Sequence, residues 1–66
     1  MLLNLKTEIA RHKLSAAKVA KGVGMSPWTF SRKVVGKNEF TRKEMYLIHS
    51  IFFPENDFYE LFKDEK

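Results

Sequence analysis

The stretch GMSP at residues 24–27 constrains the fold of this chain more than any other segment. Glycine tolerates the left-handed backbone conformation that closes a helix, and serine is a good N-cap. Proline fits a first helical turn, because its missing N–H would have no helical partner there. We therefore predict a tight connection between two helices, in which Gly24 ends the first, Ser26 caps the second and Pro27 lies in its first turn.

The residues before this connection carry the pattern of a short amphipathic helix at about residues 15–23. Ser15 is the expected N-cap, and the small Ala20 lets a neighbouring helix cross closely. Apolar residues recur with the 3.6-residue helical period at Ala16, Val19, Ala20 and Val23.

A second helix is predicted at about residues 27–35, ending at Gly36. Phe30 and Val34 are four residues apart and define its buried side, because each residue turns an α-helix by about 100°. Two short helices that are joined by a tight glycine turn, with a small residue at their crossing, describe a helix-turn-helix.

An amphipathic helix is also expected at the start of the chain. Leu5 and Ile9 lie four residues apart on one face, and charged residues occupy the other faces. Asn4 is the candidate N-cap, and the helix is expected to end near His12.

Two more helices are predicted in the C-terminal third. Thr41 and Glu44 of the stretch TRKE have the spacing of a capping box, and Pro54 ends the helix that follows. A short last helix is expected near residues 57–62, with Asn56 as its N-cap. The apolar residues of these two helices are Met45, Ile48, Ile51, Phe52, Phe58, Leu61 and Phe62.

Length and composition limit the class of protein. A chain of 66 residues buries only about 60% of the surface that its unfolded form exposes, which leaves little room for a deep active-site cleft. No cysteine is present, so disulfides and thiolate metal sites are excluded, and apolar stretches such as IFF are far shorter than the roughly 18 residues of a membrane span. We expect one all-α domain over residues 1–66, a compact bundle of about five short helices, in the cytoplasm and without membrane contact.

Charge is distributed unevenly along the chain, whose formal net charge is +4. Residues 1–43 hold ten Lys and Arg against two Glu, a net charge of +8, whereas residues 44–66 have a net charge of −4. Between Ile9 and Asn38 there are seven basic residues and no acidic one. Such a run indicates a surface that faces a polyanion, with a solvated helix face as the simpler alternative.

The stretch AKVAKGVGMSPWTFSRKVVGK resembles the helix-turn-helix of phage repressors of the Cro and lambda-repressor type, the XRE family. The resemblance extends over about residues 4–62 and depends on Ala20, Gly24 and Ser26, on TFSRKVVGK, and on EFT before the fourth helix. In this family the third helix enters the DNA major groove and the second lies across the backbone. The resemblance therefore implies a repressor-like transcriptional regulator that binds double-stranded DNA sequence-specifically.

Five residues are expected to contact bases. Measured from Phe30, four side chains of the third helix lie between about 100° and 200° around its axis and so face outward. Arg32 is the best candidate for a guanine contact, because its fork of donors matches O6 and N7 in the major groove. Trp28 is expected to lie against the groove wall or a thymine methyl group. The expected base-contacting residues are Ala17, Trp28, Ser31, Arg32 and Val35.

Other polar residues near these helices are expected to contact phosphates without reading sequence. Ser26 and Thr29 lie at the start of the third helix, where hydroxyls and free backbone N–H groups can hold a phosphate, and Ser15 repeats this arrangement on the second helix. The loop with Lys37 and Asn38 matches a backbone-contacting loop of the family. The expected phosphate-contacting residues are Ser15, Lys18, Ser26, Thr29, Lys37, Asn38 and Arg42.

The sequence departs from the family at three positions. Ala16 stands where members usually carry glutamine, Val35 where a polar residue is common, and Trp28 where a small polar residue is common. An apolar face fits thymine methyl groups, but it equally fits a protein-interaction module whose anchor patch comprises Ala16, Ala17, Trp28 and Val35. The same departures also fit an engineered or selected recognition surface.

No pattern for catalysis, a metal, a cofactor or a small-molecule substrate is present. His12 and His49 are 37 residues apart, and the sequence contains no HExxH, CxxC, glycine-rich phosphate loop or nucleophile elbow. We therefore expect a protein that is not an enzyme and has no cofactor. The C-terminal aromatic residues are interpreted as mainly core, with a homodimer contact as the alternative, and they are Phe52, Phe53, Phe58, Tyr59 and Phe62.

Overall fold

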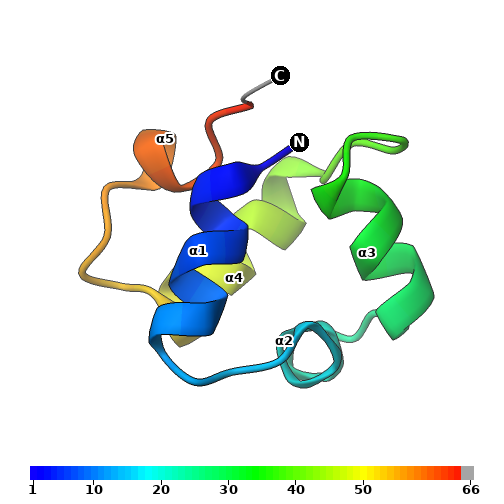
Figure 1. Ribbon diagram of the computed structural model, residues 1–66, viewed down its shortest axis with the longest axis horizontal. Helices are drawn as coiled ribbons and strands as arrows, with labels where there is room; N and C mark the ends of the chain where they lie inside the picture. Colours follow the sequence, from blue (N-terminus) through cyan, green and yellow to red (C-terminus); the bar gives the residue numbers. More distant parts are fainter. Residues whose placement is uncertain (65–66) are drawn as a thin grey trace.

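Five α-helices make up the regular structure of residues 1–64, the part of the chain that the computed structural model describes (Figure 1). They are α1 (Leu3–Arg11), α2 (Ala16–Gly22), α3 (Pro27–Val34), α4 (Arg42–Phe52) and α5 (Phe58–Leu61). These residues contain no strand, and none of their helices is long and apolar enough to cross a membrane. The prediction of an all-α bundle of about five short helices is confirmed.

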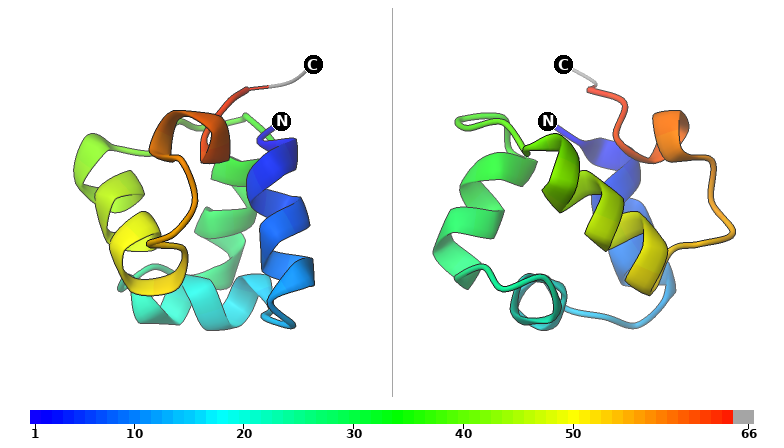
Figure 2. Two further views of the ribbon diagram at one scale, coloured as in Figure 1. Left: turned by 90° about the vertical axis from the view of Figure 1, so that its left-hand side faces the viewer. Right: turned by 180° about the vertical axis from the view of Figure 1, so that it is seen from behind.

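Helix α2 lies at one end of the molecule and α5 at the other, as both views of Figure 2 show. Between these ends α1 and α3 stand side by side, and α2 packs against α3 and α4 (Figures 1 and 2). The start of the chain is tied to the end of α3, because the Leu2 N–H donates to the Val34 carbonyl at 2.8 Å. This contact fixes α3 against α1.

A single hydrophobic core joins the helices. Every helix contributes a buried side chain, and Phe53 adds its ring directly after α4. Phe30 of α3 is fully buried and meets Phe40 edge-on, with 5.6 Å between the ring centroids. Because burial of apolar surface is the main stabilising term, the inner side of α3 is fixed, and its opposite side is held toward solvent. The buried core consists of Leu5, Ile9, Val19, Ala20, Phe30, Val34, Ile48, Phe53 and Leu61.

The connection between α2 and α3 has the predicted geometry. Gly24 adopts a left-handed φ of +77°, and Pro27 is the first residue of α3. Ser26 Oγ accepts a backbone N–H from the first turn of α3 at 3.2 Å, and Ser15 Oγ accepts one from the first turn of α2 at 3.1 Å. The two predicted helices, the left-handed glycine between them and both N-caps are confirmed.

The capping box at the start of α4 is also confirmed. The Glu44 N–H donates to Thr41 Oγ1 at 3.1 Å, and the Thr41 N–H donates to Glu44 Oε1 at 2.9 Å. Helix α4 then ends at Phe52, two residues before Pro54.

Asn4 does not cap α1, contrary to the sequence prediction. Helix α1 begins at Leu3 with Leu2 in the N-cap position, and no side chain caps it. Asn4 lies inside the first turn, where its side chain points across to α5 and donates from Nδ2 to the Glu60 carbonyl at 2.7 Å. A tertiary contact has therefore replaced the predicted local one.

The last helix is shorter than predicted, and its cap is Asp57 and not Asn56. Asp57 Oδ2 accepts the Glu60 N–H at 2.9 Å. Asn56 is held by the preceding turn instead, because its N–H donates to the Phe53 carbonyl at 3.1 Å and its own carbonyl lies 2.7 Å from His49 Nε2.

The apolar face of α4 differs from the predicted one at Ile51, which is 52% exposed. The ring that fills the core at this end comes from Phe53, whose backbone leaves the helical conformation and turns inward. Phe52 packs against Gly22 of α2, and a Cβ atom at Gly22 would overlap the Phe52 ring. A side chain at position 22 would therefore have to displace the Phe52 ring, and the sequence alone gave no sign of this contact.

Candidate nucleic-acid interface

The outer side of α3 presents the side chains that were predicted to face away from the core. Trp28 is 70% exposed, Val35 is 44% exposed, and Ser31 is also exposed. Ala17 of the neighbouring helix α2 is exposed too. The predicted direction of these residues is confirmed, and it results from the burial of Phe30 on the opposite side of α3.

Arg32 lies on the same side of α3 but is half-buried, because two residues hold its side chain. Its Nε donates to Asn38 Oδ1 at 2.9 Å, and its guanidinium carbon lies 4.9 Å from the centroid of the Trp28 ring. The Lys37 N–H also donates to the Arg32 carbonyl at 2.9 Å. The loop after α3 therefore curls back onto Arg32, a contact that the helical spacing does not reveal.

The hydroxyl groups at the start of α3 bind each other. Ser26 Oγ lies 2.9 Å from Thr29 Oγ1, and the Thr29 N–H is already used by the cap. The backbone N–H of Trp28 has no partner within residues 1–64 and lies at the N-terminus of α3, the positive end of the helix dipole. The structure thus offers one free backbone donor here, with the two hydroxyls beside it.

Three of the predicted phosphate contacts are exposed cations, namely Lys18, Lys37 and Arg42. None of them forms an ion pair with any of residues 1–64. Lys18 belongs to α2 and Lys37 to the loop after α3, next to the outer side of α3. Arg42 instead lines a groove of about 440 Å³ between α4 and α5, beside Tyr46 and Tyr59.

The other cation of α3, Lys33, is used inside the molecule. Its Nζ lies 2.7 and 2.9 Å from the two carboxylate oxygens of Glu44, and its side chain is only 14% exposed. Burial by itself raises the pKa of the Glu44 carboxyl, but hydrogen bonds from Lys33 and Thr41 outweigh it and lower that pKa below its ordinary value of 4.5. The pair links α3 to α4 and removes Lys33 from the outer surface.

An apolar groove of about 350 Å³ adjoins the outer side of α3. Phe30 and Val34 are among its lining residues, and Ala16, Ser31 and Val35 line it next to the exposed surface. Ala16 is half-buried in this groove. The other three residues of the anchor patch predicted from the sequence are exposed, namely Ala17, Trp28 and Val35.

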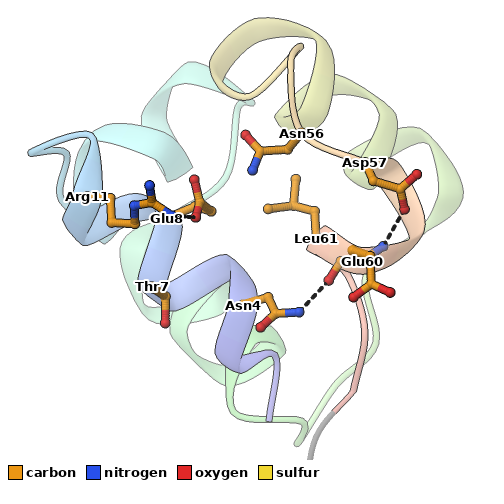
Figure 3. Close-up of a pocket in the computed structure, with 8 residues that line it drawn as sticks. All are labelled: Asn4, Thr7, Glu8, Arg11, Asn56, Asp57, Glu60 and Leu61. Carbon is orange, nitrogen blue, oxygen red and sulfur yellow. Dashed lines mark hydrogen bonds and ion pairs between the residues drawn. The ribbon is translucent and has the colours of Figure 1, made fainter.

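A polar pocket of about 290 Å³ lies between α1 and α5, away from α3 (Figure 3). Three of its four charged side chains are already engaged, because Arg11 donates to Glu8 at 3.1 Å and the Asp57 carboxylate caps α5. Within residues 1–64, no group of three or more His, Cys, Asp or Glu side chains could hold a metal ion.

The C-terminal aromatic residues divide between core and surface. Phe53 is buried, and its ring meets His12 edge-on at 5.0 Å. Tyr59 is exposed, and three phenylalanines are half-buried, namely Phe52, Phe58 and Phe62. The interpretation as mainly core is correct for Phe53 and wrong for Tyr59, which α5 directs outward.

Comparison with known proteins finds no family model, no curated protein and no solved structure that matches this sequence.

Proposed function

We propose that this chain binds double-stranded DNA sequence-specifically, with α3 in the major groove and α2 across the backbone, as a repressor-like regulator of the Cro and lambda-repressor type. The observation that carries the proposal is the outer side of α3, where Arg32 lies among exposed apolar side chains and close to unpaired cations. That combination suits the major groove, which offers paired acceptors on guanine and methyl groups on thymine.

The surrounding charges support the same proposal. Lys18 and Lys37 are exposed and unpaired within residues 1–64, so each is available to a phosphate without breaking an internal ion pair. The free backbone N–H of Trp28 at the start of α3 adds a donor that suits an anion. Asn38 keeps its amide Nδ2 for a phosphate, because only its Oδ1 is used by Arg32.

A salt titration tests this proposal. With about five or six phosphates neutralised, the logarithm of the affinity for a mixed-sequence duplex should fall with the logarithm of the salt concentration at a slope near −5. A slope near zero would contradict DNA binding through this basic surface.

A protein-interaction module is the second candidate, and the high exposure of Trp28 and Val35 favours it. Binding of a protein through such an apolar patch depends little on salt, because few counterions are released. The salt titration therefore separates the two functions.

A further inference from the structure

Arg32 is held from two directions before any partner arrives. Trp28 lies one helical turn earlier on α3 and places its indole ring beside the guanidinium, 4.9 Å from the ring centroid to the guanidinium carbon. Asn38, in the loop after α3, accepts the Arg32 Nε–H at 2.9 Å. The three side chains come from one turn of helix and the loop that follows it, so they form a local unit on the outer side of α3.

These contacts decide which donors of Arg32 stay free. A guanidinium has five N–H groups in a fixed plane, and Asn38 uses the one on Nε. Within residues 1–64, neither Nη1 nor Nη2 has a hydrogen-bond or ion-pair partner. The end of the side chain therefore presents two parallel N–H donors at the surface of α3.

Two parallel donors have one matching base in the major groove. Guanine presents O6 and N7 there as adjacent acceptors, whereas the other three bases present at most one acceptor beside a donor or a methyl group. We propose that Trp28 and Asn38 are positioning residues that set Arg32 to read one guanine through Nη1 and Nη2. This inference rests on the proposed function of α3 as the helix that enters the major groove.

The positioning has an energetic reason. A free arginine side chain loses rotamer freedom when it is fixed at an interface, and this loss weakens binding. Arg32 has already lost part of that freedom in the unbound protein. Removing Asn38 or the Trp28 ring returns that freedom, and it allows Nε to compete with Nη1 and Nη2 for the acceptors.

The first test needs no DNA. The Arg32 Nε–H should give a slowly exchanging NMR signal in the parent chain, because Asn38 protects it. Asn38→Asp keeps the acceptor oxygen and should keep the signal, whereas Asn38→Ala should lose it. A signal that is equally protected in Asn38→Ala would overturn the inference.

The second test measures base preference, as the ratio of affinities for duplexes with G·C or A·T at the base pair that Arg32 reads. Asn38→Ala should lower this ratio by about threefold or more, and Asn38→Asp should keep it, although its added charge weakens binding to every duplex. Trp28→Leu should lower the ratio as well, whereas Trp28→Phe retains a ring face and should preserve most of it. Lys37→Ala is the matched control in the same loop, and it should weaken all duplexes alike.

The outcomes separate this inference from the proposed function. If the parent chain binds no duplex, both fail. If the parent prefers guanine but Asn38→Ala keeps the full ratio, the positioning role is wrong and DNA binding stands. A uniform loss on every sequence in Arg32→Ala would show that Arg32 holds a phosphate, which also overturns the inference. In an Arg32→Lys background, Asn38→Ala should have no further effect on the ratio, because lysine has no Nε–H to position.

Discussion

At the scale of single residues, Trp28 is the side chain whose exposure most needs a reason. An indole that is 70% exposed leaves a large apolar surface in water, and on α3 it lies opposite the buried Phe30. We expect Trp28→Ala to change the free energy of unfolding by less than about 0.5 kcal/mol, as exposed positions do. Specific duplex binding should weaken by about tenfold or more, because both the apolar contact and the support of Arg32 are lost.

Thermal unfolding and a duplex titration of Trp28→Ala check this prediction together, with Phe30→Ala as a control that should cost about 3–5 kcal/mol. A melting temperature that collapses in Trp28→Ala would show that the indole is part of the core. Unchanged stability with unchanged affinity would point to the protein partner.

Truncation of Arg32 and truncation of Lys37 are predicted to have different effects on DNA binding. Arg32→Ala should cost about 1–3 kcal/mol on the preferred sequence and relax the preference at one base pair. Lys37→Ala should weaken all sequences similarly and reduce the salt slope by about one. Affinities on a panel of duplexes that differ at single base pairs distinguish the two patterns. Equal losses across the panel for both variants would refute the assignment.

The direction of these side chains was predictable, but the unit that holds Arg32 was not. Helical spacing fixes the angle of Trp28 relative to Phe30, so the exposure of Trp28 could be predicted from the sequence. The contact between Arg32 and Asn38 depends on the path of the loop after α3, which no periodic pattern encodes.

At the scale of elements, the turn between α2 and α3 depends on one backbone conformation. Gly24 has a φ of +77°, and no atom would lie within 4 Å of an added Cβ, so a substitution there costs backbone strain and not a steric clash. Gly24→Ala should destabilise the fold by about 1 kcal/mol, and Gly24→Asn by less, because asparagine tolerates the left-handed region better. Urea unfolding measures both variants, and equal losses would contradict the strain argument.

The ion pair between α3 and α4 predicts a dependence of stability on pH. The pKa of Glu44 is lowered in the folded chain, so its contribution is present above the unfolded pKa near 4.5 and is lost as the pH falls through the folded pKa. Glu44→Gln keeps a capping-box residue but removes the charge. At pH 7 we expect it to cost about 0.5–1 kcal/mol, a small value because solvent screens this partly exposed pair.

The check is urea unfolding of the parent chain and Glu44→Gln at pH 7 and pH 3. The difference between them should shrink as the pH falls through the folded pKa of Glu44, because the parent carboxyl then becomes protonated. A difference of the same size at both pH values would show that the charge of Glu44 contributes nothing.

The caps show which parts of an element a sequence determines. Ser15, Ser26 and Thr41 act on backbone groups three residues away, so local reasoning was enough. Asn4 was predicted wrongly because its partner, Glu60, is distant in sequence. Asn56 and Asp57 are adjacent, and either residue type can cap a helix. Which of them caps α5 depends on the path of the chain after α4, which the sequence pattern does not specify.

At the scale of the whole molecule, the charge distribution agrees with the proposed orientation on DNA. Residues 1–43 have a net charge of +8 and include α2 and α3, whereas residues 44–66 have a net charge of −4 and include α5. Helix α5 lies at the opposite end of the molecule from α2 (Figure 2). Such an asymmetry orients a domain toward a polyanion as it approaches.

The surface between α4 and α5 bears on how many copies of the chain could bind one site. The exposed Tyr59 and Tyr46 border the groove between α4 and α5, and a homodimer contact through the C-terminal aromatic residues is still the alternative to a purely core role for them. Two copies related by a two-fold axis read an inverted repeat with half-sites about 10 base pairs apart, whereas one copy reads a single short site.

Selection of duplexes from a random library by the parent chain tests the central claim most directly. We predict enrichment of a short motif that contains an invariant guanine, and loss of preference at that base pair when Arg32→Ala is used in its place. If the parent chain enriches no duplex over the starting library at low salt, this domain does not read DNA sequence.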